Sequence, residues 1–166
     1  MKQIVSMTAV LIFVACVPLV AVAAAPGNPL VRGKTVTFHL VEKQIGFNYI
    51  DNPPRQGQNA PPLIGDQFAF TSDVFTKSGA RAGSLDATCT VARGGVHPSG
   101  PCYGIFKFKG GELVGIASLS FSNPATQIVV VGGTGVYAGV TGSVLSVSRG
   151  QNSPFTDDTF QLLLKP

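Results

Sequence analysis

Apolar and polar residues alternate through most of the chain after residue 34, which is the period of a half-buried β-strand. In residues 35–42, Val36, Phe38 and Leu40 share one face with Glu42. Further strand-like segments cover residues 67–75, 82–91, 103–109, 112–121, 127–131, 140–148 and 155–164. The pattern predicts an all-β fold of eight antiparallel strands, and the aromatic residues on the inner faces favour a closed β-barrel over a sandwich.

Glycine and proline account for 20 and 12 of the 166 residues and mark the predicted breaks between strands. Residues 51–62 and 98–101 are predicted to lie outside strands, because proline cannot donate a hydrogen bond to a ladder. The segment Gly132-Gly133-Thr134-Gly135 follows an apolar strand, but it lacks the Gly-x-Gly-x-x-Gly spacing and the following helix of a dinucleotide site. These glycines are predicted to serve a turn and a close strand crossing, and no cofactor is expected.

The composition excludes several classes of protein. Charged residues make up 12% of the chain, about half the usual share, which argues against a coiled coil or a long helical bundle. Hydrophobic residues make up 45% and the net charge is only +4, so the chain is not of the disordered type. The basic residues are scattered and form no cluster with stacking aromatic residues, so nucleic acid is not expected as a partner.

The N-terminal segment has the features of an export signal. Lys2 precedes an apolar stretch that ends in Ala21-Val22-Ala23, a small-x-small cleavage site. We predict a signal peptide over residues 1–23, an extended segment over 24–33 and one barrel domain over 34–166. The alternatives are a lipoprotein cut before Cys16 and a retained membrane anchor. With the signal removed, no membrane span remains, and the protein is expected to be secreted, extracellular or periplasmic.

The cysteine content agrees with export. Cys16 leaves with the signal peptide, so Cys89 and Cys102 remain as an even pair in an oxidising compartment. We predict a disulfide between them. Two cysteines without matching histidine ligands do not form a zinc site, so no metal is expected.

Several segments hold motifs in a specific order along the chain. These are Gly65-Asp66-Gln67-Phe68-Ala69-Phe70, then Arg81-Ala82-Gly83 and Cys89, the glycine-tyrosine run over 132–142, and Asp158-Thr159-Phe160-Gln161-Leu162. On these residues the chain resembles the allene oxide cyclase barrel family over about residues 34–164; the plant dirigent proteins are close relatives of that family. The resemblance implies an eight-stranded antiparallel barrel with a largely apolar cavity. It also implies trimers, as in the plant members, and the steering of an unsaturated epoxide into a ring.

The resemblance also implies roles for single residues. Family members carry a glutamate on the first strand and an asparagine two residues later, which Glu42 and Gln44 match; a shift of three would place His39 there instead. Phe70 and Ser72 match a cavity phenylalanine and a polar residue that holds a bound water. The Arg-Gly-Ser-Pro loop of the family is absent from this chain.

The strand pattern gives Glu42 an argument of its own. Its parity points it into the barrel, where an apolar wall raises the pKa of a carboxyl group and suits it to act as a general acid or base. The alternative is that the strand ends near Val41 and that Glu42 is a solvated end residue. The candidate ligand pocket is lined by Phe38, Phe68, Phe70, Ser72, Phe106 and Phe108.

Two functions from different classes follow. The first is a secreted barrel of allene oxide cyclase or dirigent type that binds a small apolar or aromatic molecule and steers its cyclisation or coupling, as an isomerase would. The second is a non-catalytic secreted barrel that binds a ligand or contributes to the cell surface. An acidic residue in an open cavity favours the first function, and a cavity filled by phenylalanine favours the second.

Overall fold

The computed structural model describes residues 33–53, 61–120, 122–150 and 153–165. The predicted signal peptide over 1–23 lies outside these residues, as does nearly all of the predicted extended segment over 24–33.

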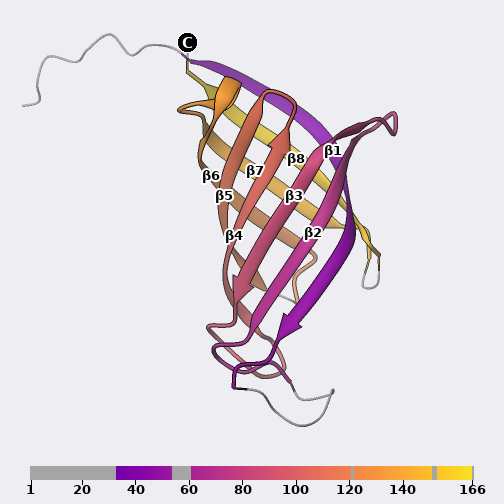
Figure 1. The fold of residues 1–166 in the computed structure, drawn as a ribbon, viewed down its shortest axis with the longest axis vertical. Coiled ribbons are helices and arrows are strands. Elements are labelled where there is room, and N and C mark those ends of the chain that lie inside the picture. The colour runs from indigo at the N-terminus through magenta and orange to yellow at the C-terminus, as the bar shows by residue number, and fades with distance from the viewer. Residues whose placement is uncertain (1–32, 54–60, 121, 151–152, 166) are drawn as a thin grey trace, which may run out of the picture. The chain divides into compact units, whose positions relative to one another are not determined.

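Eight strands form a closed antiparallel barrel, which confirms the predicted fold class (Figure 1). Each strand pairs with the next one along the chain, and β8 closes the sheet by pairing with β1. The strands are β1 (Lys34–Ile50), β2 (Gln67–Thr76), β3 (Arg81–Thr90), β4 (Ser99–Phe108), β5 (Gly111–Ser120), β6 (Ala125–Gly133), β7 (Thr141–Ser148) and β8 (Phe155–Leu164). Alternate residues of every strand face the interior, as the sequence pattern predicted.

Strand β1 is longer than predicted, because it continues for eight residues past Glu42 to Ile50. Its pairing with β2 shifts between Gln44 and Gly46, so Ile45 is an extra residue in a β-bulge. A bulge reverses the alternation of side chains beyond it. Phe47 therefore shares the inner face with its partner Phe70, although simple alternation from Glu42 would turn it outward.

Two further details of the predicted strands are corrected. Strand β4 begins at Ser99, so the predicted break over 98–101 is wrong for residues 99–101, and Pro101 lies within the strand, opposite Ser118. The glycine segment after β6 forms a 3₁₀ turn, η1 (Gly135–Tyr137). Gly135 has a φ of 58°, and a Cβ there would lie 2.0 Å from the carbonyl oxygen of Gly110, so the predicted turn with close strand approach is confirmed. No helix in the described segments is long and apolar enough to cross a membrane.

One half of the barrel, where β1 begins and β8 ends, is filled by side chains. Phe160 is fully buried at its centre and packs against Phe38, Phe106 and Phe108. Tyr137 from the η1 turn packs on Phe108 and extends this aromatic cluster. Close packing of this kind leaves the filled half without room for a ligand.

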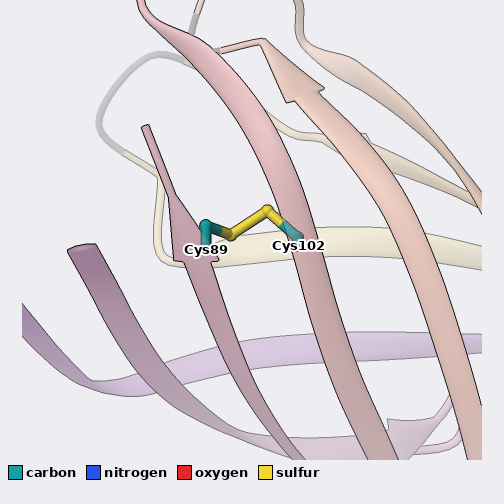
Figure 2. The surroundings of a disulfide bond; sticks show 2 residues. All are labelled: Cys89 and Cys102. Carbon is teal, nitrogen blue, oxygen red and sulfur yellow. A yellow bond between two sulfur atoms is a disulfide. The ribbon is translucent and has the colours of Figure 1, made fainter. Parts of the chain in front are cut away.

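The predicted disulfide between Cys89 and Cys102 is confirmed (Figure 2). The two residues are direct partners across β3 and β4, so the bond joins adjacent strands of the barrel. Cys89 is buried in a second apolar cluster with Phe68 and Val91, and Phe70 and Leu119 pack against this cluster. The bond therefore fixes the wall at the opposite end of the barrel from the aromatic cluster around Phe160.

Candidate functional site

The other half of the barrel, where β1 approaches its end and β8 begins, is hollow. It contains a cavity of about 250 Å³, a size that suits a small ligand. Apolar side chains supply most of the wall, and the polar residues include Glu42, Gln44, Ser146 and Thr156. The apolar lining includes Phe70, Phe106, Ala117 and Ile128.

Two glycines create much of this space. Gly104 on β4 and Gly115 on β5 are direct partners in the ladder, and both line the cavity. A Cβ on Gly115 would lie 2.6 Å from Cγ2 of Ile128 across the ladder to β6. The interior is hollow here because neither of two neighbouring strands places a side chain at this pair of positions.

Glu42 lies in the wall of this cavity and is only 8% exposed. The Ser72 hydroxyl on β2 donates a 2.6 Å hydrogen bond to Glu42 Oε1. Burial raises the pKa of the Glu42 carboxyl, and the hydrogen bond from Ser72 offsets part of that rise. A buried carboxyl with a raised pKa, held by a hydroxyl beside an apolar cavity, has the properties of a general acid or base.

A second carboxyl group lies next to Glu42. Asp158 on β8 is 1% exposed, and its Oδ1 accepts a 2.6 Å hydrogen bond from the Ser146 hydroxyl on β7. Burial first, and then the negative charge of Glu42, raise the pKa of Asp158 to about 7. Asp158 carried the family resemblance as part of a motif but was not predicted as a site residue; its inward parity, shared with Phe160 and Leu162, is the sequence signal that places it in the interior.

The six predicted pocket residues lie in different parts of the barrel. Phe70 and Phe106 line the cavity, and Ser72 is buried against Glu42. Phe38 and Phe108 belong to the aromatic cluster of the filled half, and Phe68 belongs to the cluster at the disulfide. The structure thus brings Ser72, Phe70 and Phe106 together with Glu42, while contact of any of the six with a ligand stays a prediction.

Residues beyond the bulge in β1 were not anticipated from the sequence. Phe47 contributes to the cavity wall, and its ring centroid lies 5.9 Å from that of Phe68. Tyr49 packs on Phe68 as well, at 5.1 Å, and its hydroxyl donates to Oδ2 of Asp66. The sequence signal for both is that Phe47 and Tyr49 are two residues apart, as on one face of a strand. This spacing indicates the inner face only when the bulge at Ile45 is known.

Asp66, one of the residues that carried the family resemblance, has a structural role. Its side chain is fully buried and accepts hydrogen bonds from the backbone N–H groups of Asn52 and Leu63, at 3.0 and 2.7 Å, besides the Tyr49 hydroxyl. These bonds tie the segments on both sides of residues 54–60 to the start of β2. The motif therefore shapes the end of the barrel near the cavity.

No family model and no curated protein matches the chain, but solved structures do. A pyocyanin demethylase is 20% identical, with a TM-score of 0.65 over 76% of this chain and 99% of its own. An exo-specific intermolecular Diels-Alderase is 14% identical, with a TM-score of 0.60 over 78% of this chain and 96% of its own. A pterocarpan synthase dirigent protein is 16% identical, with a TM-score of 0.55 over 80% and 95%.

This chain has the dirigent-like barrel fold shared by those proteins. The finding agrees with the allene oxide cyclase and dirigent resemblance in the sequence. The three matching structures are named as a demethylase, a Diels-Alderase and a pterocarpan synthase dirigent protein. Each of these names refers to a reaction of a small molecule.

Proposed function

We propose that this protein binds a small, largely apolar or aromatic molecule in the hollow half of the barrel and steers its cyclisation or coupling. The observation that carries the proposal is the buried Glu42 carboxyl in the wall of an otherwise mainly apolar cavity of about 250 Å³. An apolar wall folds and orients an apolar ligand, and a single polar group fixes its direction. The fold shared with a Diels-Alderase and a dirigent protein supports this class of function.

Glu42 is the proposed catalytic residue. Its carboxylate would take a proton from the ligand or return one to it, and the Ser72 hydroxyl holds its Oε1 oxygen in place. Phe70 and Phe106 from β2 and β4 would press the ligand toward this carboxylate. The reaction class is an isomerisation or coupling in which the protein supplies the shape of the cavity and one acid–base group. Such a reaction does not require a cofactor.

The second candidate is a barrel that binds its ligand without chemistry. The aromatic cluster around Phe160 favours it, because half of the interior is already occupied by side chains. Both candidates require binding in the same cavity. They differ in whether replacing Glu42 changes turnover or only affinity.

Export of the protein to an oxidising compartment belongs to the same proposal. The disulfide between Cys89 and Cys102 supports it, since such bonds persist outside the reducing cytosol. The ligand would accordingly be met outside the cell or in the periplasm.

Ligand binding in the cavity is tested with the neutral fluorescent probe N-phenyl-1-naphthylamine. We expect the wild-type protein to bind it with micromolar affinity, and Ala117→Trp to weaken the binding at least about tenfold, because a large indole would fill an apolar pocket. Ser118→Trp is the matched control, since Ser118 is the next residue on β5 and is exposed on the outer face. Equal affinity in the two variants would place the probe outside the cavity and contradict the proposal.

We also propose that the protein assembles as a homotrimer through the outer face of β4, β5 and β6. Tyr103, Ile116 and Val129 are neighbours across these strands and are 48%, 45% and 53% exposed. Light scattering should give three times the mass of one chain for the wild type. The double variant Ile116→Lys, Val129→Lys should give the mass of a single chain, because two lysines would disrupt the apolar contact. Val136→Lys, at an exposed position in η1, should remain a trimer. A single-chain mass for the wild type at micromolar concentration would refute the assembly.

A further inference from the structure

Asp158 occupies an unusual position beneath the cavity. It faces inward on β8, opposite Ser146 of β7 on one side and Leu40 of β1 on the other. Its Oδ1 atom is satisfied by the Ser146 hydroxyl, but its Oδ2 atom is buried and has no hydrogen-bond partner among the residues that the structure describes. A negative charge on a buried oxygen atom that accepts no hydrogen bond is energetically costly. The surroundings of Oδ2 therefore favour the protonated form of Asp158.

Glu42 is the diagonal neighbour of Asp158 across the ladder between β1 and β8. Glu42 lies opposite Thr156, two residues before Asp158, and both side chains point into the barrel. Inward side chains in this relation have Cα atoms about 7–8 Å apart, which long side chains span. Each carboxyl also accepts a hydrogen bond of 2.6 Å from a serine hydroxyl on its neighbouring strand, Ser72 for Glu42 and Ser146 for Asp158.

We propose that Glu42 and Asp158 form a carboxyl pair that holds one proton between them, with Asp158 as the protonated positioning residue and Glu42 as the ionised member that meets the ligand. This inference rests on the proposed function and deepens it. Two carboxylates side by side in an apolar interior repel each other, and a single proton removes one of the two charges. With that proton on Asp158, Glu42 keeps its negative charge despite its burial and is available as a base near neutral pH.

The surroundings of Asp158 leave Glu42 as the ionisable group that faces it. The β7 segment contributes Ser146 and contains no ionisable residue. The negative charge of Asp157 also raises the pKa of Asp158, but by less than that of Glu42. The Asp157 carboxylate itself is paired on the outer face with Arg149, at 2.6 Å. On β1, His39 bonds Thr159 on the exposed side and Lys43 is exposed, so neither faces the interior.

The pair defines the chemistry of the ligand. With one proton bound, the pair carries a single negative charge, and Glu42 accepts a hydrogen bond or a proton from the ligand. The substrate class is therefore a neutral, mostly apolar molecule with one acidic O–H, N–H or activated C–H group. In a cyclisation Glu42 would take that proton and return it to another atom of the same molecule, so that no co-reactant is required and Asp158 keeps its proton throughout.

The first test needs no ligand. In a ¹³C NMR titration of aspartate carboxyl groups, one resonance should titrate near neutral pH and disappear in Asp158→Asn. In Glu42→Gln the same resonance should titrate at lower pH, because the charge that opposes ionisation is gone. Asp157→Asn is the control and should leave the near-neutral titration in place. If every aspartate titrates at ordinary acidic pH, the pair does not hold a proton and the inference is overturned.

The second test measures the affinity of N-phenyl-1-naphthylamine at pH 6 and pH 8. An apolar molecule that covers the pair favours the form with one proton over the form with none. If binding raises the pKa of Asp158 by about one, the affinity above that pKa falls about tenfold. We expect such a loss in the wild type and equal affinities at the two pH values in Asp158→Asn. An unchanged pH dependence in Asp158→Asn would contradict the inference. Failure of every variant to bind the probe would instead count against the proposed function, while the NMR titration would still decide the protonation of the pair.

Discussion

Replacing Phe160 with alanine should lower the free energy of unfolding by about 3–5 kcal/mol. The Phe160 ring stacks on Phe38 with 4.6 Å between the ring centroids. It meets Phe106 and Phe108 edge-on, at 5.1 and 5.9 Å. The closed barrel holds these neighbours in place, so the space left by the ring cannot collapse. Urea unfolding followed by circular dichroism measures the loss.

The matched control for this variant is Phe155→Ala on the same strand. Phe155 is half-buried on the outer side, where the Lys43 and Arg149 cations lie 5.9 and 5.8 Å from its ring centroid. Its removal should cost only about 1 kcal/mol, because the contacts are few and solvated. Equal losses in the two variants would mean that the aromatic cluster is not the main support of the filled half.

The stability of the protein should fall as the pH rises from about 5 to 8. The pKa of Asp158 is raised from 3.8 to about 7 by folding, so the folded state holds this proton more tightly than the unfolded state. The resulting stabilisation is fully present below pH 3.8 and is lost as the pH rises through about 7. A difference of about three between the two pKa values corresponds to a total of about 4 kcal/mol, most of which lies between pH 5 and 8.

Asp158→Asn should remove most of this pH dependence, because asparagine is neutral at every pH and can still accept the Ser146 hydrogen bond. Asp157→Asn should still lose stability between pH 5 and pH 8. Arg149 lowers the pKa of Asp157, so this carboxyl group does not change its charge in that range. Urea unfolding of the three proteins at pH 5 and pH 8 makes the comparison. A wild type that is equally stable at both pH values would show that Asp158 ionises without cost.

Much of the fold was predictable from the sequence because strand alternation is a local property. The inward parity of Phe68, Phe70 and Ser72 on β2 holds in the structure, as does that of Phe106 and Phe108 on β4. The extension of β1 was not predictable, because the bulge at Ile45 breaks the alternation that defines a strand. The start of β4 was not predictable, because proline lacks a backbone donor and usually marks a break, whereas Pro101 lies within the ladder opposite Ser118.

The distinction between the filled and hollow halves was beyond sequence reasoning. It depends on the register of eight strands, which decides that Gly104 lies opposite Gly115 and that Phe160 meets Phe38 and Phe106. Parity alone assigned the inward phenylalanines of three strands, Phe38, Phe68, Phe70, Phe106 and Phe108, to one pocket. The proximity of Asp158 to Glu42 was not predictable for a related reason, since it arises from the pairing of the first and last strands.

The hollow half of the barrel is the proposed ligand site, with Glu42 as the polar group that meets the ligand. A crystal structure of the protein with N-phenyl-1-naphthylamine would locate a bound ligand. We expect the probe in the cavity between Phe70, Phe106 and Ile128, with its N–H group within hydrogen-bond distance of the Glu42 carboxylate. A probe bound only on the outer face of the barrel, or a cavity closed by side chains, would contradict the proposal.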